Sequence, residues 1–383
     1  MRLVFVVAMV DSIHTARWLS QFADQDLSII LFPSTPHRRV HPEIKALLKA
    51  SNQMQISIAP MMNVLSLPLW FVDKCLPLRI RSRLLHRLIE SEKPVVLHAL
   101  ETQNAGYLVA QTIPHLSFLP KVFLSIWGSD LFWFQQFARH RKKIQYLLSK
   151  VDSLGTECQR DVELARFFGF SGNLLPTVPA SGGVDLDVIK KLSRPKIPSQ
   201  RLKIMVKGYS GFVGRSLTAL EALQCLSVEL AGYEIHVYSA SLKTIRQARR
   251  TAKEHQLRII CHKKHSLSHN EVISLFSEAR LSISISLSDG FSGSLRESMA
   301  TGCFPIESMY SCGNEWTLEG KSALFVDPRD VSSIVKAIKL TLSSDDLVDS
   351  AAEINIKLAN ERFSSAAVLE QVKNCYFDVD QHG

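Results

Sequence analysis

Short apolar runs recur along the whole chain, and amphipathic helical patterns separate them. The first half contains "RLVFVVAM", "LSIILF", "PVVLHAL" and "KVFLSIW", and the second half contains "LKIMV", "YEIHVYS", "LSISIS" and "CFPIES". Such alternation is typical of parallel sheets with helices on both faces, because the crossover between two parallel strands is usually a helix. We therefore predict an α/β protein built from doubly wound, Rossmann-like sheets.

The chain of 383 residues exceeds what a single hydrophobic core usually supports, so we expect two domains. A Gly-, Pro- and Ser-rich stretch, "GGVDLDVIKKLSRPKIPSQR", separates the two series of apolar runs. We predict the following division: an N-terminal domain over 1–182, a linker over 183–201, a second domain over 202–365, and a C-terminal helix or tail over 366–383 that could pack back on the first domain. The two domains are expected to face one another across a cleft.

The formal charge of +9 suits a phosphorylated or polyanionic ligand, or an anionic membrane surface. The basic stretches "PLRIRSRLLHRL" and "RHRKKIQ" lack the aromatic interleaving of a single-strand nucleic-acid platform, so we expect no nucleic-acid partner. The apolar opening "MRLVFVVAMV" is too short for a membrane span and is read as a buried strand. The seven scattered cysteines favour a reducing compartment. We expect a cytoplasmic protein that could contact the inner face of the membrane peripherally.

A glycine-rich turn in "LKIMVKGYSGFVGRSLTALEAL" follows an expected strand and precedes an expected helix. Gly208, Gly211 and Gly214 would expose backbone amides, and Lys207 and Arg215 would add positive charge at the helix N-terminus. These features together would hold a phosphate. An ordinary glycine turn with surface charges is the alternative. The spacing G-x-x-G-x-x-G disfavours a dinucleotide fingerprint.

A second turn, "SLSDGFSGSLRESMATG", places two carboxylates eight positions apart. The strand before it is expected to end near Ser286, and a helix should run from about Ser294 to Gly302. Asp289 would then lie at the strand end and Glu297 in the first helical turn. Glu297 could simply complete a capping box with Ser294. Together with the upstream phosphate turn, the acids instead favour a nucleotide-diphosphate sugar, whose hydroxyls need acceptors and whose diphosphate needs donors.

The stretch "DGFSGSLRESMATGCFPI" resembles the acidic-pair motif of the family 4 retaining glycosyltransferases, glycosyl transferases group 1, which have the GT-B fold. The resemblance extends to "SIHTARW", "VLHALETQNAGYL", "SIWGSDLFWF", "LLPTVPASGGVDLD", "VKGYSGFVGRS" and "EWTLEGKSALFVDPRD". It implies a metal-independent hexosyltransferase that moves a sugar from a nucleotide-diphosphate donor to a glycan or lipid-linked saccharide, as in the biosynthesis of cell-surface polysaccharide or lipopolysaccharide.

By this resemblance, Glu297 accepts hydrogen bonds from the nucleotide ribose and Asp289 contacts the transferred sugar. Lys207 and Arg215 neutralise the diphosphate leaving group. The family usually has Glu where this chain has Asp289, which is one methylene shorter, so we expect either a looser contact with the sugar or a different sugar. The residues expected to line the donor are Gly211, Gly214, Gly290, Phe291, Ser292, Gly293, Ser294 and Leu295.

Polar residues near the first-domain strand ends are further candidates. We count Asp130 and His98 as catalytic candidates, and His14, Trp127 and Glu101 as acceptor-side candidates. Structural roles are the alternatives: Asp130 as a helix N-cap, His98 as a hydrogen-bonded strand-end residue, His14 as a first-turn residue. Trp127 stands where many relatives carry His, and it could stack on a sugar or belong to the core.

No metal constellation is predicted, and no cofactor beyond the donor substrate is expected. The tripeptides Asp185-Leu186-Asp187 and Asp378-Val379-Asp380 imitate a D-x-D metal motif, but the first is in the expected linker and the second in the tail. Two alternative functions stay open. One is a sugar-nucleotide epimerase of the same architecture, which needs a base in the cleft, and the other is a catalytically impaired sugar-nucleotide-binding module.

Overall fold

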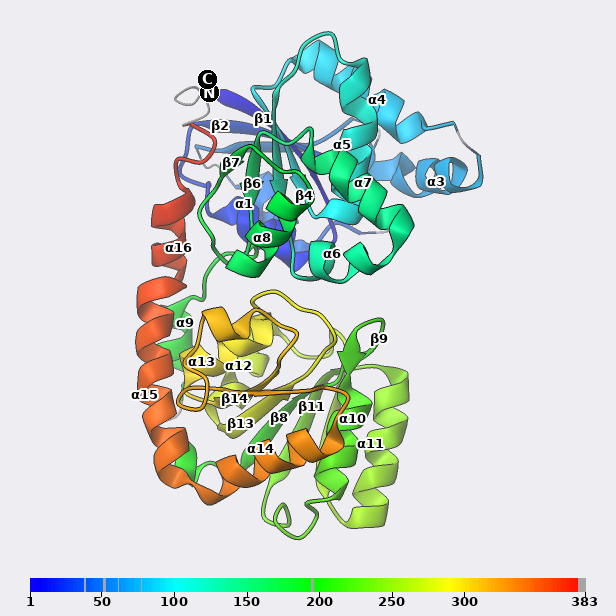
Figure 1. The fold of residues 1–383 in the computed structure, drawn as a ribbon. Coiled ribbons are helices and arrows are strands. Elements are labelled where there is room, and N and C mark those ends of the chain that lie inside the picture. The colour runs from blue at the N-terminus through cyan, green and yellow to red at the C-terminus, as the bar shows by residue number, and fades with distance from the viewer. Residues whose placement is uncertain (38, 51–52, 61, 77, 194–195, 378–383) are drawn as a thin grey trace. The chain divides into compact units, whose positions relative to one another are not determined.

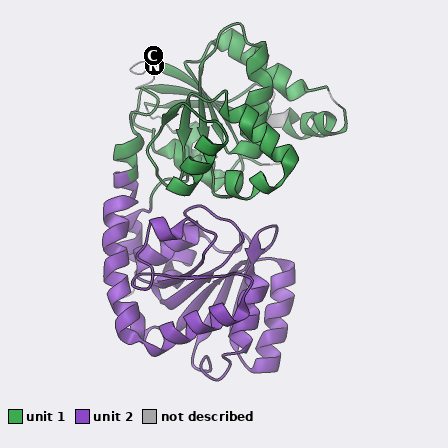
Figure 2. Cartoon of the chain, viewed as in Figure 1, with its two compact units in different colours: residues 1–183, 368–383 green, residues 184–367 purple. Residues whose placement is uncertain are grey.

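The computed structural model describes residues 1–37, 39–50, 53–60, 62–76, 78–193 and 196–377. The chain folds into two compact units, which Figure 2 shows in different colours. Unit 1 consists of Met1–Gly183 together with the residues from Val368 onward, and unit 2 is Val184–Ala367. Each unit has its own sheet and its own apolar core.

Unit 1 contains a parallel sheet with the order β3-β2-β1-β4-β5-β6-β7 among the described residues (Figure 1). Its strands are β1 (Arg2–Ala8), β2 (Leu27–Pro33), β3 (Gln55–Ile58), β4 (Val96–Leu100), β5 (Lys121–Ser125), β6 (Ser153–Gly155) and β7 (Asn173–Leu174). The chain winds outward from β1 in one direction and then restarts at β4 in the other. This order leaves a switch point between β1 and β4, at the carboxyl edge of the sheet, where doubly wound sheets bind ligands.

The helices of unit 1 cover both faces of this sheet. They are α1 (Ile13–Ser20), α2 (Pro42–Lys49), α3 (Met62–Cys75), α4 (Ile80–Glu92), the π-helical turn η1 (Thr102–Gly106), α5 (Tyr107–Thr112), η2 (Ile113–His115), α6 (Ser129–Phe132), η3 (Phe134–Gln136), α7 (Ala138–Leu148) and α8 (Gln159–Phe167). Leu85 of α4, Val109 of α5 and Leu147 of α7 join the buried apolar cluster beneath one face. Burial of this face is what holds the helices on the sheet.

The C-terminal segment packs on unit 1. The Trp18 indole donates a hydrogen bond to the Tyr376 hydroxyl over 3.0 Å, and the Arg2 guanidinium donates to the carbonyl oxygens of Tyr376 and Phe377. Tyr376 is fully buried and its ring lies 4.8 Å from that of Phe22. The last described residues are therefore a structural part of unit 1.

Unit 2 repeats the doubly wound order with β12-β11-β8-β13-β14-β15, again all parallel among the described residues. These strands are β8 (Lys203–Lys207), β11 (Glu234–Ala240), β12 (Arg258–Lys263), β13 (Ala279–Ser284), β14 (Phe304–Ser308) and β15 (Leu324–Val326). A small antiparallel hairpin follows β8 and consists of β9 (Ser210–Gly211) and β10 (Gly214–Arg215). Both sheets confirm the predicted Rossmann-like architecture.

Unit 2 also has helices on both faces. They are α9 (Leu186–Leu192), η4 (Pro198–Gln200), α10 (Ser216–Gln224), α11 (Leu242–His255), α12 (His269–Ser277), α13 (Gly293–Thr301), η5 (Gly313–Glu315), α14 (Val331–Ser343), α15 (Asp345–Arg362) and α16 (Ser365–Val372), the last of which continues into unit 1. Leu281 and Ile283 of β13 join the cluster that includes α10 and α14. Ser282 and Ser284 alternate with them and so face the opposite side, where Tyr238 packs on Phe276 of α12.

The stretch 183–201, expected as a linker, contains helix α9, which contacts α12 and α13. Asp185 caps this helix by accepting hydrogen bonds from the amides of Asp187 and Val188. None of the helices within the described ranges is both long enough and apolar enough to cross a bilayer.

Candidate functional site

Lys207 and Asp289 form an ion pair at the switch point of unit 2. Lys207 ends β8 and Asp289 lies in the loop after β13, its neighbour in the sheet. The Lys207 Nζ lies 3.3 Å from the Asp289 Oδ2, and both side chains are about one-third exposed or less, at 26% and 31%. Burial alone would lower the pKa of Lys207, but Asp289, Glu307 and Glu297 together raise it. Lys207 is therefore held as an ammonium group.

Helix α13 begins two residues earlier, relative to Glu297, than a capping box with Ser294 requires. Its N-cap is Ser292, whose hydroxyl accepts a hydrogen bond from the Leu295 amide over 3.0 Å. Glu297 is thus the fifth helical residue, and the expected box with Ser294 does not form. Ser294 instead accepts a hydrogen bond from the Tyr238 hydroxyl over 2.6 Å. The capping interpretation of Glu297 was wrong, because two serines compete for the cap and the chain turns at the first.

Glu297 lies on the first half of α13, and its carboxylate is mostly buried, with 15% of the side chain exposed. The Nδ1 of His269, at the start of α12, is 3.5 Å from the Glu297 Oε1. Glu297 also lies close enough to Lys207 to help raise the pKa of its ammonium group. The structure thus brings Lys207, Asp289 and Glu297 into one electrostatic cluster within unit 2.

Between Asp289 and Glu297, some residues contribute backbone amides and others pack in the core. The Phe291 side chain is buried and stacks on Trp316 with ring centroids 4.3 Å apart, and Leu295 is fully buried, so both side chains hold the turn in place. The Gly290 amide donates to the Asp289 carboxylate over 3.0 Å. Gly293 begins the helix, where first-turn amides have no helical partners and the dipole favours an anion. This geometry suits phosphate at the N-terminus of α13.

The glycine-rich turn is a hairpin, which the sequence had not predicted. Gly211 has a φ of +138°, and a Cβ at Gly214 would come within 2.2 Å of the Tyr209 carbonyl oxygen. Glycine is needed at both positions, for the backbone conformation at the first and for the close approach at the second. The Arg215 amide donates to the Ile285 carbonyl oxygen, which ties the hairpin to the end of β13. Helix α10 begins directly after Arg215.

In unit 1, Asp130 and Glu101 are two buried carboxyl groups that influence one another. Asp130 lies in the first turn of α6, and its Oδ2 accepts hydrogen bonds from the amides of Thr102 and Trp127. The N-cap of α6 is Gly128, so the expected capping role of Asp130 was wrong. Burial and the Glu101 charge raise the pKa of Asp130 well above its usual value.

Glu101 follows β4 at the switch point of unit 1 and has a φ of +81°, which is rare for a residue with a side chain. Its carboxylate accepts hydrogen bonds from the amides of Asn104 and Ala105, so it caps the π-helical turn. Burial raises the pKa of Glu101, although these amides oppose the shift. Strained residues and π-helical turns are frequent at functional sites.

His14 and Trp127 lie next to one another. His14 is exposed in the first turn of α1, and its ring centroid is 5.6 Å from that of Trp127. The Trp127 indole N–H is buried without a hydrogen-bond partner. A half-buried indole beside an exposed imidazole provides an aromatic surface of the kind that sugars stack on.

His98 does not lie at an accessible strand end. It is completely buried in β4, with Nδ1 2.6 Å from the Tyr376 hydroxyl and Nε2 2.9 Å from the Ser125 hydroxyl. Burial lowers the pKa of His98 to about 3, so the ring is neutral near pH 7. Its placement among the catalytic candidates was therefore wrong, and it holds the C-terminal segment on unit 1.

Sequence reasoning missed Glu307 in β14 and Tyr238 in β11. Glu307 is 1% exposed, and its charge interacts with Lys207 and Asp289. A signal was present, since "CFPIES" ends an apolar strand with a carboxylate. Such a residue at a carboxyl strand edge can face a ligand site. Tyr238, which bonds Ser294, had no comparable signal.

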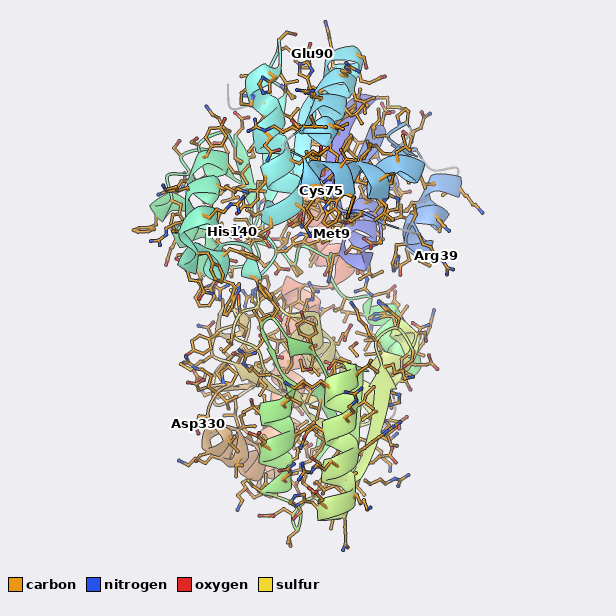
Figure 3. The ribbon with its side chains drawn as sticks, turned by 90° about the vertical axis from the view of Figure 1, so that its right-hand side faces the viewer. Met9, Arg39, Cys75, Glu90, His140 and Asp330 are labelled. Atoms are coloured by element: carbon orange, nitrogen blue, oxygen red, sulfur yellow. The ribbon has the colours of Figure 1, made fainter. Side chains whose placement is uncertain are left out.

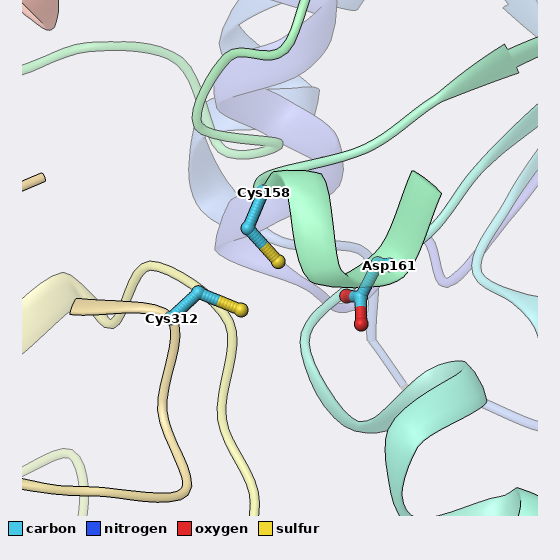
Figure 4. A group of neighbouring side chains, drawn as sticks. All are labelled: Cys158, Asp161 and Cys312. Carbon is cyan, nitrogen blue, oxygen red and sulfur yellow. The ribbon is translucent and has the colours of Figure 1, made fainter. Parts of the chain in front are cut away.

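Figure 4 labels two residues at the start of α8 in unit 1. Cys158 is its N-cap residue, and Asp161 lies in its first turn with its carboxylate 3.0 Å from the Arg160 Nε. Cys312, also labelled there, belongs to unit 2, so these residues form no site within one unit. Of the two D-x-D tripeptides, the first begins at the cap of α9, and Asp378-Val379-Asp380 lies outside the described residues.

Two family models match the chain. Residues 3–157 match the model described as Glycosyl transferase 4-like, and residues 228–358 match that of Glycosyl transferases group 1. No curated protein matches the sequence.

Solved structures similar to this chain include proteins described as glycosyltransferases. Sucrose-phosphate synthase from Thermosynechococcus elongatus is 13% identical, with a TM-score of 0.72 and 100% of both chains covered. A glycosyltransferase from Rickettsia africae is 13% identical, with a TM-score of 0.67 and 100% of this chain and 99% of the other covered. Anabaena Alr3699/HepE in complex with UDP and glucose is 12% identical, with a TM-score of 0.68 and 98% and 99% covered. At these identities the likeness establishes the fold.

Proposed function

Because this chain belongs to the GT-B glycosyltransferases of the glycosyl transferases group 1 family, we propose that it is a retaining hexosyltransferase. It moves a sugar from a nucleotide-diphosphate donor to a glycan or lipid-linked saccharide, in the synthesis of cell-surface polysaccharide or lipopolysaccharide. The observation that carries the proposal is the Lys207–Asp289 pair at the switch point of unit 2, beside the N-terminus of α13. This places a cation, a carboxylate and helix amides at one edge of the sheet.

Each group has a distinct task in the proposed reaction. Lys207, Arg215 and the first-turn amides of α13 neutralise the negative charge that develops on the departing diphosphate. Asp289 accepts hydrogen bonds from hydroxyls of the transferred sugar, and Glu297 accepts them from the nucleotide ribose. Because these cations and amides supply the electrostatic stabilisation, the proposed mechanism uses no metal ion and no cofactor.

Donor binding requires Asp289 to exchange partners. In the structure its Oδ2 faces the Lys207 ammonium, 3.3 Å away. A bound donor would bring sugar hydroxyls to Asp289 and diphosphate oxygens to Lys207, so both partners of the ion pair would be replaced. Both side chains are partly exposed, so separating the pair costs little free energy.

We assign acceptor recognition to the switch-point side of unit 1. Asp130 and Glu101 offer carboxyl groups whose pKa values are raised by burial, which favours the protonated form that can donate as well as accept a hydrogen bond. His14 and Trp127 offer an aromatic surface. These four residues are the candidates for contact with acceptor hydroxyls and sugar faces.

A thermal-shift panel of UDP-, GDP-, ADP- and CMP-sugars identifies the donor, since a ligand of the folded state raises the apparent melting temperature. We would begin with UDP-sugars, because Anabaena Alr3699/HepE was solved with UDP-glucose. Transfer and hydrolysis are then measured for Glu297→Ala and Arg215→Ala. Matched controls are Glu254→Ala and Arg250→Ala, which remove an exposed ion pair on α11.

The site variants should lower donor turnover by on the order of 10²-fold, the cost of losing one stabilising donor or acceptor, while the controls should not. Binding without turnover in the wild type would favour the impaired binding module, and interconversion of the sugar without an acceptor would favour the epimerase. A protein that binds no sugar nucleotide at millimolar concentration would rule out all three functions.

We further propose that the protein is cytoplasmic and meets the inner membrane surface through α3 and α4. Four apolar side chains between Leu67 and Leu78 are exposed, and α3 ends at Cys75, which Figure 3 labels. Exposed cations lie among them and after them in the chain: Lys74, Arg79, Arg83 and Arg87. Apolar side chains beside basic ones are complementary to an anionic lipid surface.

Co-sedimentation with phosphatidylcholine vesicles, with and without phosphatidylglycerol, tests this contact. Binding should require the anionic lipid and should weaken with salt and with Phe71→Ser. Phe167→Ser, which changes a more exposed phenylalanine on α8, is the control. Equal binding to both vesicles, or none to either, would contradict the membrane proposal.

A further inference from the structure

A row of in-register residues crosses the sheet of unit 2 at its carboxyl edge. Lys207 of β8 pairs with Tyr238 of β11, and the register of β8 with β13 sets Lys207 beside Ser284 on the other side. Ser284 pairs in turn with Glu307 of β14. Neighbouring strands lie about 4.8 Å apart, and in-register residues project from the same face. Because Ser284 is small, the long side chains of Lys207 and Glu307 can approach each other over it.

Glu307 is held in this row without full hydrogen bonding. The side chain is 1% exposed, and the hydroxyls of Ser284 and Ser292 bond to its carboxyl group. Ser292 is also the N-cap of α13, which links Glu307 to the turn that carries Asp289. The Oε1 atom of Glu307 is buried with no hydrogen-bond partner. An ionised carboxylate with a buried, unpaired oxygen costs more than a neutral carboxyl group in the same position.

The charges around Glu307 also disfavour its ionisation. The groups that face it are Lys207 from β8 and Asp289 from the loop before α13, with the Tyr238 hydroxyl from β11 also in its electrostatic range. Burial raises the pKa of Glu307 well above its usual value and Asp289 raises it further, whereas Lys207 and the two serine hydroxyls lower it. With Glu297 also near Lys207, an ionised Glu307 would place three carboxylates around one ammonium group.

We propose that Glu307 is a positioning residue that acts through Lys207. As a neutral carboxyl group it leaves the Lys207 ammonium available to the diphosphate of the donor, and as a carboxylate it holds the ammonium and adds a negative charge that repels the diphosphate. This inference rests on the proposed function for the identity of the ligand. It assigns Glu307 no contact with the donor.

Diphosphate binding should depend on pH through Glu307. Deprotonation of Glu307 as the pH rises should weaken diphosphate binding before Lys207 itself loses its proton, because the pKa of Lys207 is also raised. Glu307→Gln keeps the shape and stays neutral, so it should lose this pH dependence. Ser284→Ala removes a hydrogen bond that favours the carboxylate, so it should move the weakening to higher pH.

The first measurement uses no ligand. Thermal unfolding of wild type and Glu307→Gln is followed from about pH 5 to about pH 9. A carboxyl group whose pKa is raised in the folded state stabilises the fold fully below its unfolded pKa, and that stabilisation is lost as pH rises through the folded pKa. The melting temperature of Glu307→Gln, measured relative to that of the wild type, should therefore increase as pH rises. The increase should be larger in a Lys207→Met background, where no ammonium stabilises the carboxylate.

The second measurement uses inorganic pyrophosphate as the probe, with calorimetry over the same pH range. The wild-type dissociation constant should rise with pH above the Glu307 pKa, by at most about tenfold for each pH unit, and that of Glu307→Gln should not. Glu278→Gln is the matched control, because Glu278 pairs with Lys203 at the opposite end of β8. In the Lys207→Met background, Glu307→Gln should no longer change pyrophosphate binding.

The outcomes separate this inference from the function it rests on. Parallel pH profiles for wild type, Glu307→Gln and Ser284→Ala in both measurements would overturn the role of Glu307 alone. An effect of Glu307→Gln on pyrophosphate that persists in Lys207→Met would show that Glu307 does not act through Lys207. A wild type that binds no pyrophosphate, whatever its unfolding profile, would overturn the phosphate site and the proposed function with it. Ser284→Ala keeps the test decisive if Glu307→Gln does not fold.

Discussion

The Tyr376 hydroxyl lies 2.6 Å from the Nδ1 of His98, although 278 positions separate the two residues. The same hydroxyl accepts a hydrogen bond from the Trp18 indole. All three side chains are buried or nearly so. One phenolic oxygen therefore completes the hydrogen bonding of two buried rings and holds the C-terminal segment against the sheet of unit 1.

Tyr376→Phe should destabilise unit 1 by about 1–3 kcal/mol, because His98 and Trp18 would each lose a partner that water cannot replace in the core. Urea unfolding, followed by hydrogen exchange in β4 and α1, measures this loss. Tyr146→Phe, which removes an exposed hydroxyl on α7, should leave the unfolding midpoint unchanged. Equal midpoints for the two variants would contradict the role assigned to the Tyr376 hydroxyl.

His98 should make unit 1 sensitive to acid. Its pKa is lowered to about 3 in the folded protein, so its contribution is complete above the unfolded pKa of about 6.5 and is lost as pH falls toward 3. At pH 5 the free energy of unfolding should be lower by about 2 kcal/mol because of His98. His98→Gln should show a flatter pH dependence of the unfolding free energy, and His265→Gln, in a turn of unit 2, should not. Superimposable profiles for wild type and His98→Gln would refute this.

Gly214→Ala should damage the phosphate turn. A methyl group there would lie 2.2 Å from the Tyr209 carbonyl oxygen, which is backbone and cannot move aside without opening the hairpin. We expect a cost of about 1–3 kcal/mol and weaker pyrophosphate binding. Gly232→Ala is the control, since no atom lies within 4 Å of its added methyl group. Similar melting temperatures and affinities for both variants would show that the hairpin tolerates the substitution.

Asp130→Asn should raise stability while lowering transfer. Burial raises the pKa of Asp130, so the folded protein disfavours the ionised carboxylate. The stability that the protonated group gives below pH 3.8 is therefore lost as pH rises through the folded pKa. The neutral amide removes this cost. We expect a higher melting temperature near pH 7 and a lower kcat/KM for the acceptor. A lower melting temperature would mean that the carboxylate's hydrogen bonds to the amides of Thr102 and Trp127 outweigh its burial.

Asp289→Asn should lower sugar transfer without weakening binding of the diphosphate. Removing the carboxylate frees Lys207, so the bare nucleoside diphosphate of the identified donor should bind equally well or up to about fivefold more tightly, as expected for a partly exposed ion pair. Sugar transfer should fall by on the order of 10²-fold. Titration of the diphosphate and initial-rate kinetics measure the two effects. Parallel losses in both would place Asp289 at the diphosphate instead.

The elements that carry the unit 2 site could be predicted from local patterns. In "LSISIS", Leu281 and Ile283 alternate with Ser282 and Ser284, and the structure buries the apolar pair in one core and turns the serines to the other face. Gly302 adopts the left-handed conformation that ends α13, as predicted. Both features depend on neighbours in the chain, and this is why the sequence sufficed for them.

The prediction of a capping box was wrong because local patterns can compete. Ser292 and Ser294 both precede a helical stretch, and Glu297 stands three residues after the second. The choice of Ser292 as the cap depends on Tyr238, which bonds Ser294, and on Glu307, which accepts a hydrogen bond from Ser292. Both of those residues come from other strands of the sheet.

The sequence by itself determined the doubly wound architecture, the two turns and the acids within them, because strand periodicity and turn chemistry are properties of short segments. The tertiary structure alone decided that Lys207 pairs with Asp289, that Glu307 stands in the same row, and that His98 binds Tyr376. Those relationships join residues from different strands or from opposite ends of the chain. They follow from strand order and register, which the pattern of any one segment does not contain.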